Sequence, residues 1–193
     1  MQRRTLLQGL AAVLAAPLLP ACARDDRPPR LASTGGAGNI AAAGTQATAA
    51  GRGAIVPLDK PASEWKALLS PAAYAVLFEE DTERAGSSPL NAQKRPGTYI
   101  CAACFLPLFD AAHKFESGTG WPSFTRPIDP RHVGTKRDFK LILPRTEYHC
   151  ARCGGHQGHI FNDGPRPRGE RWCNNGVALN FVPEGDALPA LRS

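Results

Sequence analysis

Four of the six cysteines fall into two C-x-x-C pairs, Cys101-Ala-Ala-Cys104 and Cys150-Ala-Arg-Cys153, with 45 residues between the pairs. Each pair can place two thiolates at neighbouring corners of a tetrahedron, so together they predict one structural zinc site with four thiolate ligands. Two glycines directly follow the second pair, and they permit the tight turns and N–H···S contacts that metal thiolates need. Two redox-active C-x-x-C units or plain disulfides are the alternatives.

Cys173 is the cysteine left over, because Cys22 lies near the N-terminus and the other four are assigned to zinc. An unpaired cysteine can be a small buried hydrophobic residue. Its neighbours favour a nucleophile, since Arg171 and Asn175 lie two residues before and after it and a strand turns all three side chains to one face. A guanidinium lowers the pKa of an adjacent thiol, and an amide can orient a polar substrate atom.

Two histidines and a tryptophan complete the set of candidate site residues. His156 and His159 are three residues apart, and since four thiolates saturate zinc, both are free for acid–base chemistry unless they extend a metal site. Trp121 follows a glycine-rich run that we expect to be a loop. Aromatic rings on loops are often recognition surfaces, with a core position as the alternative.

Four blocks of this sequence carry a family pattern. They are Arg95-Pro-Gly-Thr-Tyr-Ile-Cys-Ala-Ala-Cys104, His113-Lys-Phe-Glu-Ser-Gly-Thr-Gly-Trp-Pro-Ser-Phe124, Cys150-Ala-Arg-Cys-Gly-Gly-His-Gln-Gly-His-Ile-Phe-Asn-Asp-Gly-Pro165 and Arg171-Trp-Cys-Asn-Asn175. In matching order, these blocks resemble the type-B methionine sulfoxide reductases, enzymes that reduce the R epimer of methionine sulfoxide and so repair this oxidation product. The resemblance covers roughly residues 60 to 183.

The resemblance implies a role for each candidate residue. Cys173 is then the catalytic residue, with His159 and Asn175 beside the sulfoxide, and Trp121 lines the pocket for the substrate methyl group. The remaining substrate-site positions that it implies are His156, Arg171 and Phe161. The zinc ligands that it implies are Cys101, Cys104, Cys150 and Cys153.

Reduction of a sulfoxide requires a thiolate aimed at sulfur and a proton delivered to oxygen. We expect Cys173 to attack as a thiolate whose pKa is lowered by Arg171, and a protonated His159 to give its proton to the oxygen. Methionine leaves and Cys173 becomes a sulfenic acid, which an external thiol reductant, thioredoxin-like or other, must reduce.

Three departures from the family pattern stand out. Asn174-Asn175-Gly176 replaces a frequent Ile-Asn-Ser after the catalytic cysteine, which keeps the matched asparagine and alters its surroundings. Thr119 stands where many members have a resolving cysteine, so the usual recycling disulfide is in doubt. Residues 132 to 144 are unlike the family segment, and no role is carried onto them.

The secondary structure expected to carry these residues is mainly β. Residues 63–69 read as a short helix that begins with Ser63 as cap, and a second helix begins at Ser70-Pro71. Beyond Pro96, short aromatic and β-branched runs separated by turn residues predict strands. These runs are 98–100, 139–143, 147–149, 159–161 and 177–182. The resemblance implies two small antiparallel sheets in a compact sandwich or partial barrel, with short N-terminal helices outside and a structural zinc site.

The N-terminus reads as an export signal. Arg3-Arg4 precede an apolar stretch and resemble a twin-arginine signal, with a general secretory signal as the alternative. Cleavage after Ala23 competes with lipidation at Cys22, since residues 19–22 resemble a lipobox. We expect a signal peptide over 1–23, a flexible linker over 24–58, a reductase domain over 59–185 and a tail over 186–193. The expected location is periplasmic or otherwise exported, with a possible lipid anchor.

Length and charge narrow the function classes. The 193 residues suit one globular domain with appendages, and 42% hydrophobic against 21% charged residues suits a folded protein. The net charge is +6, but the basic residues of the main body are interleaved with acidic ones. We therefore expect no nucleic acid partner. We also expect the protein to be a monomer. A zinc-ribbon binding module and a general disulfide oxidoreductase remain the other two classes.

Overall fold

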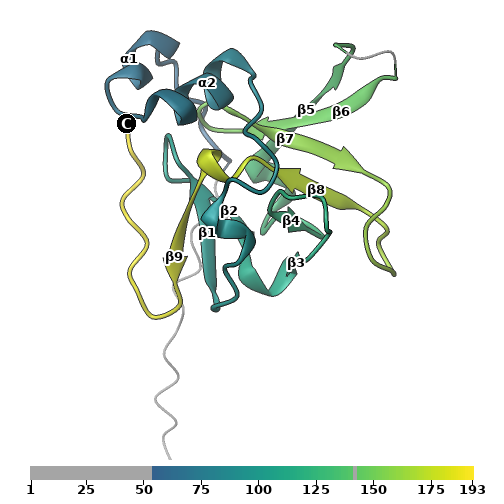
Figure 1. Ribbon diagram of the computed structural model, residues 1–193. Coiled ribbons are helices and arrows are strands. Elements are labelled where there is room, and N and C mark those ends of the chain that lie inside the picture. Colours follow the sequence, from purple (N-terminus) through teal and green to yellow (C-terminus); the bar gives the residue numbers. More distant parts are fainter. Residues whose placement is uncertain (1–53, 141–142) are drawn as a thin grey trace, which may run out of the picture. The chain divides into compact units, whose positions relative to one another are not determined.

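Nine strands form two antiparallel sheets in residues 54–140 and 143–193, the part of the chain that this computed structural model describes (Figure 1). One sheet has the strand order β2-β1-β9, and the other has the order β3-β4-β8-β7-β6-β5. The strands are β1 Gly97–Cys101, β2 Pro107–Asp110, β3 Lys114–Phe115, β4 Ser123–Phe124, β5 Val133–Asp138, β6 Arg145–Cys150, β7 His156–Phe161, β8 Arg171–Asn174 and β9 Leu179–Pro183. The predicted fold class, mainly β with two small antiparallel sheets, is confirmed.

Two short α-helices precede the sheets. The predicted start of the second is confirmed, because the Ser70 hydroxyl accepts a hydrogen bond from the backbone N–H of Ala73 at 3.2 Å and a proline occupies the first turn. The first helix begins earlier than predicted, directly after Pro61, so Ser63 lies inside it and does not cap it. The helices are α1 Ala62–Lys66 and α2 Pro71–Glu79. The 3₁₀ turns are η1 Pro89–Asn91, η2 Ala111–His113, η3 Pro130–His132 and η4 Gly176–Ala178.

The strand predicted over 139–143 is wrong for the residues that can be compared. Phe139, Lys140 and Leu143 are neither helix nor strand, while 141–142 lie outside the described residues. The apolar run is at the end of the β5–β6 hairpin, which extends away from the other strands in Figure 1. Phe139 is 67% exposed there and Leu143 is 78% exposed. Side chains beyond the core have nothing to pack against, so an apolar composition alone does not make a strand.

Aromatic rings from both sheets form the core that fixes β8, the strand of Cys173. Phe109 of β2 stacks on Phe124 of β4 with ring centroids 4.2 Å apart, and it meets Tyr148 of β6 edge-on at 6.0 Å. Trp172 of β8 packs edge-on against Tyr148 at 5.0 Å. Burial of such rings stabilises a fold by about 1.5–3 kcal/mol each, so the contacts of Trp172 with this aromatic cluster help to fix β8.

The predicted boundaries of the signal peptide, linker and tail can be compared with the structure only in part. The predicted signal peptide over 1–23 and most of the linker over 24–58 lie outside the described residues. In the part that is described, no helix has the length and apolar composition to cross a membrane. Residues 186–193 contain neither helix nor strand, yet the backbone N–H of Arg192 donates to the carbonyl of Cys104 at 3.1 Å. The tail therefore contacts the turn that carries the first C-x-x-C pair.

Candidate functional site

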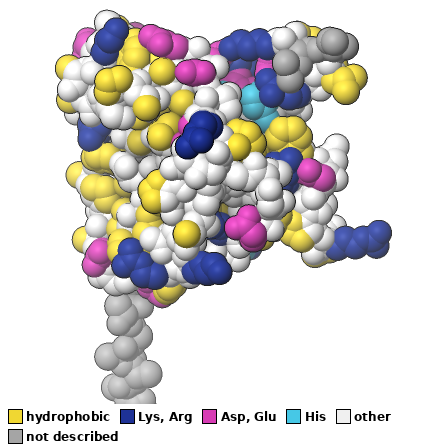
Figure 2. Space-filling view, viewed as in Figure 1, with side chains coloured by type: hydrophobic (Ala, Val, Ile, Leu, Met, Phe, Trp, Pro, Cys, Tyr) yellow, Lys and Arg dark blue, Asp and Glu magenta, His cyan; other side chains and the backbone are white. Residues whose placement is uncertain are grey.

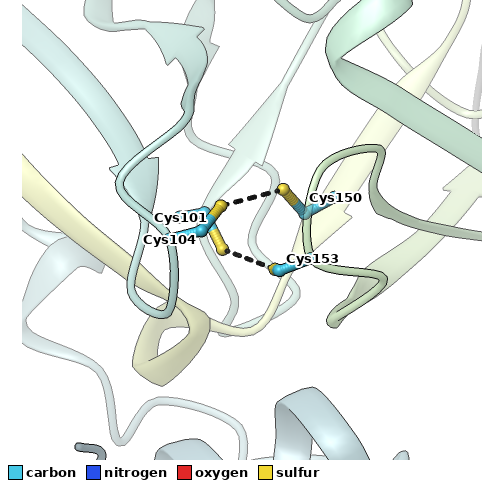
Figure 3. A group of neighbouring side chains, drawn as sticks. All are labelled: Cys101, Cys104, Cys150 and Cys153. Atoms are coloured by element: carbon cyan, nitrogen blue, oxygen red, sulfur yellow. Dashed lines mark hydrogen bonds between the residues drawn. The ribbon is translucent and has the colours of Figure 1, made fainter. Parts of the chain in front are cut away.

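The two C-x-x-C pairs come together as a four-sulfur cluster (Figure 3). Cys101 ends β1 and Cys104 lies in the turn after it, while Cys150 ends β6 and Cys153 lies in the turn between β6 and β7. All four sulfurs lie within 4.8 Å of one another. The separations of 3.6 Å and 3.5 Å between facing sulfurs suit a tetrahedral ion with bonds of about 2.3 Å and exceed a disulfide bond. Gly154 takes a φ of +71° in the second turn, as predicted.

The ionisation of these thiols also suits a bound cation. Hydrogen bonding from the neighbouring sulfurs, Cys104 first, raises the pKa of Cys101 well above its ordinary value. The pKa of Cys104 is lowered because Cys101 and the other sulfurs donate to its thiolate. A bound divalent cation would stabilise thiolate ligands in such a cluster. The donor set is compatible with zinc.

The predicted active-site residues converge on one pocket of about 140 Å³. Cys173 of β8 and His159 of β7 are directly opposite each other in the antiparallel pair, so their side chains share one face of the sheet. The pocket is lined by Thr82, Trp121, Arg145, Gly158, His159, Phe161, Cys173, Asn174 and Asn175. Two predicted members, His156 and Arg171, do not line it.

Arg171 acts through contacts behind the pocket. Its guanidinium makes two hydrogen bonds to the Asp163 carboxylate, at 2.8 and 2.9 Å, and stacks over the Phe161 ring. Burial raises the pKa of the Cys173 thiol, and the charge of Arg171 with the hydroxyls of Thr119 and Ser123 only partly opposes this shift. Burial therefore favours the thiol over the thiolate at Cys173, an effect that a sequence does not show.

His159 is also neutral at rest. Burial lowers its pKa, and the hydrogen bond to Asp138 opposes this shift without cancelling it. The Nε2 atom of His159 lies 2.7 Å from an oxygen of Asp138. Burial therefore favours the neutral ring, because the desolvation of the imidazole outweighs its contact with a carboxylate.

His156 lies behind His159 and contributes to the framework. Its Nδ1 is 2.9 Å from the Glu147 carboxylate, both side chains are 4% exposed, and the two imidazole rings are 5.4 Å apart. It lines a larger cavity of about 700 Å³ that shares Thr82, Arg145 and His159 with the small pocket. Figure 2 shows Lys and Arg side chains gathered around a histidine beside the β5–β6 hairpin, with acidic groups among them.

The segment after α2 positions Trp121 and Asn175 from a distant part of the chain. The backbone carbonyl of Glu83 accepts from the Trp121 indole N–H at 3.0 Å, and its backbone N–H donates to the Asn175 side chain at 3.1 Å. The Asn175 amide also donates to the carbonyl of Gln157 at 3.1 Å. One of its two amide hydrogens is left over by these contacts and is available to a substrate oxygen.

Comparison with known proteins agrees with this geometry. The SelR domain family matches residues 69–183. The chain belongs to this family, that of the MsrB methionine sulfoxide reductases. A Pseudomonas putida (strain W619) protein named peptide methionine sulfoxide reductase MsrB is 47% identical over 130 residues, which is 67% of this chain and 98% of that protein. The MsrB of Methanosarcina barkeri is 48% identical over 66% of this chain and 89% of its own length.

A plant relative is similar over a smaller share of its length. The protein named peptide methionine sulfoxide reductase B1, chloroplastic, from Arabidopsis thaliana is 48% identical over 62% of this chain and 59% of that protein. Membership of the MsrB family identifies an oxidoreductase that acts on methionine sulfoxide.

Asn174, one of the departures from the family pattern, belongs to a buried polar chain that reaches the sulfur cluster. The Asn174 amide donates to Gln157 at 3.3 Å and its oxygen accepts from the Tyr148 hydroxyl at 2.7 Å. The Gln157 amide in turn lies 3.5 Å from the sulfur of Cys101. All four side chains are buried. Asn174, which replaces the frequent isoleucine, therefore has its buried polar groups hydrogen-bonded to Tyr148 and Gln157.

The second departure, Gly176, is explained by close packing against η1. A Cβ atom at Gly176 would lie 1.9 Å from the Ser88 hydroxyl oxygen and 2.4 Å from its Cβ. We expect Gly176→Ser, which restores the frequent family residue, to destabilise the protein by about 1–3 kcal/mol through overpacking, measured as a lowered urea midpoint. Ser88→Gly combined with Gly176→Ser should recover part of this loss. An unchanged midpoint for the single variant would show that Ser88 does not restrict the site.

Asp138, Arg145, Thr82 and Glu83 are site residues that the sequence did not single out. Asp138 lies within residues 132 to 144, to which no role was assigned, and Arg145 directly follows them. No motif marks them, because their contacts with His159 are made across strands. An acidic residue followed seven positions later by an arginine is too common a pattern to signal a site.

Proposed function

We propose that this protein reduces methionine-R-sulfoxide, free or in proteins, to methionine, with Cys173 as the attacking group. The observation that carries the proposal is the convergence of Cys173, His159, Asn175 and Trp121 on one pocket. A pocket of about 140 Å³ suits a single side chain. The Trp121 and Phe161 rings supply an apolar wall for the substrate methyl group, and the groups opposite them are polar.

The reaction begins from a thiol and a neutral imidazole. His159 takes the proton of Cys173, the thiolate sulfur bonds to the sulfoxide sulfur, and the same proton passes from the imidazole to the sulfoxide oxygen. The oxygen and its proton end on Cys173 as sulfenic acid, and methionine leaves. The cysteine sulfur loses two electrons and the methionine sulfur gains two. Asn175 orients the oxygen through its remaining amide hydrogen.

Zinc is proposed as the structural ion of the four-cysteine cluster, one per chain. Cys101, Cys104, Cys150 and Cys153 would hold it, with no ligand position left open. Bound zinc would supply folding free energy and would connect the turn after β1 to the turn between β6 and β7. An external thiol would reduce the sulfenic acid, and the chain would act as a monomer.

One assay tests the proposed reaction. The purified domain is incubated with separated R and S epimers of methionine sulfoxide, with dithiothreitol as reductant, and methionine is measured. Turnover of the R epimer is expected, because the shape of the pocket wall around the methyl group distinguishes the two arrangements at sulfur. Preferential reduction of the S epimer, or of neither epimer, would overturn the proposal.

The place of action is proposed to be outside the cytosol, periplasmic or anchored through a lipid at Cys22. We expect Arg3→Lys together with Arg4→Lys to leave the precursor in the cytosol, because the twin-arginine route depends on the arginine pair and not only on charge. The measurement is the fraction of precursor in separated cell compartments. Unchanged export of this variant would indicate the general secretory route.

A further inference from the structure

Asp138, the last residue of β5, accepts three hydrogen bonds through its carboxylate. Its oxygens accept from the backbone N–H of Lys140 at 2.8 Å, from the Arg145 guanidinium at 2.5 Å and from His159 Nε2 at 2.7 Å. Its side chain is only 9% exposed, against 13% for that of His159. This carboxylate is therefore held in a fixed position and largely shielded from solvent, unlike the carboxylate of a surface ion pair.

The position of Asp138 determines which ring nitrogen of His159 faces the chemistry. The Lys140 N–H, His159 and Arg145 hold the pKa of the Asp138 carboxyl far below its usual range, so it accepts and cannot donate. The hydrogen of the neutral imidazole is therefore on Nε2, and the lone pair is on Nδ1. Since His159 is directly opposite Cys173 on the next strand, Nδ1 is the nitrogen left for the thiol proton.

We infer that Asp138 is a positioning residue that fixes the tautomer of His159 and stabilises its charged form, so that His159 can carry the proton of Cys173 to the sulfoxide oxygen. This inference rests on the proposed function. The proton moves from the Cys173 sulfur to Nδ1 of His159 and then to the sulfoxide oxygen, while the Nε2 hydrogen stays on the ring and Asp138 stays ionised. No oxidant or reductant beyond the sulfoxide itself takes part.

Other charged groups around His159 set the direction of the expected effects. The groups that face it or share its cavity are Asp138 from β5, Arg145 and Glu147 from β6, His156 from β7, Cys173 from β8, and Glu80, Lys136, Arg137 and Lys140 around the larger cavity. Asp138 raises the pKa of His159, whereas Arg145 lowers it in addition to burial. Removing one or the other should therefore move this pKa in opposite directions.

The test measures the pKa of His159 by NMR in the full domain, with resonances assigned by comparison with a His159→Gln variant. In Asp138→Asn, this pKa should fall further below that of the wild type, and in Arg145→Gln it should rise. The rate of the first turnover in Asp138→Asn should fall at least ten-fold at pH 7. The pH midpoint for alkylation of Cys173 by iodoacetamide should move upward, because a less stable imidazolium makes the thiolate harder to form.

Asp129→Asn is the matched control, since Asp129 pairs with Arg131 ahead of β5, at the other end of that strand from Asp138. It should leave the pKa of His159 and the first-turnover rate unchanged. An unchanged pKa of His159 in Asp138→Asn would overturn the inference. If that variant fails to fold, an unchanged pKa of His159 in Arg145→Gln, which removes the guanidinium that holds Asp138, would overturn it. If the wild-type protein does not reduce the sulfoxide, the proposed function is refuted. The NMR comparison would still show whether Asp138 sets the pKa of His159.

Discussion

Replacement of any cluster cysteine by serine, for example Cys101→Ser or Cys153→Ser, is expected to unfold the domain or sharply lower its melting temperature. Structural zinc in small domains supplies about 10–16 kcal/mol of apparent binding free energy, which matches or exceeds the whole stability of a typical domain, about 5–15 kcal/mol. The Cys101 and Cys153 sulfurs lie 3.6 Å from each other, although the two residues are 52 positions apart in the sequence. Loss of either ligand therefore separates two parts of the fold.

The measurements are thermal unfolding and metal content of each purified variant, with one zinc per chain expected for the wild type. Cys173→Ser is the matched control: it makes the same chemical change outside the cluster and should keep both the metal and the melting temperature. A metal-free preparation with full activity and two intact disulfides would refute the zinc assignment.

The second large effect concerns recycling: oxidised Cys173 should form no intramolecular disulfide in the wild type. The other cysteines that the structure describes all belong to the cluster, and Thr119 stands where many family members have a resolving cysteine. The Thr119 hydroxyl is close enough to the Cys173 sulfur to lower the pKa of this thiol, so a sulfur placed at this position would lie within reach. Thr119→Cys should therefore convert the sulfenic acid into a disulfide with Cys173.

Mass spectrometry after treatment with excess sulfoxide and no reductant distinguishes these products. The wild type should give a dimedone adduct on Cys173, and Thr119→Cys should give the disulfide instead. Thr135→Cys introduces the same group on exposed β5 and should behave like the wild type. A disulfide from Cys173 to a native cysteine in the wild type would contradict the prediction and would reopen the assignment of the zinc ligands.

The sequence predicted the cysteine cluster because C-x-x-C spacing is a short-range pattern. The pocket residues Cys173, His159 and Trp121 were predicted from family blocks that are each continuous in the chain, whereas side-chain alternation alone placed Arg171 in the pocket, which it does not line. The helix start at Pro71 was predicted for the same reason, since Ser70 caps it from the next position. These features depend on neighbours a few residues apart.

The features that could not be predicted depend on long-range contacts and on burial. Asp138 reaches His159 across β6, and Glu83 reaches Asn175 over 92 residues of chain. The resting protonation of Cys173 and His159 differed from expectation because burial outweighs the nearby charges. Neither desolvation nor strand register is encoded in a short motif.

The central claim is that the sulfur of Cys173 takes the oxygen of the sulfoxide, and the amount of methionine formed without reductant tests it most directly. The wild-type domain, mixed with excess methionine-R-sulfoxide, should release one methionine per chain and then stop, because the sulfenic acid is not reduced. Cys173→Ser should release none. Methionine formed by Cys173→Ser, or continued release by the wild type beyond one per chain, would contradict the account.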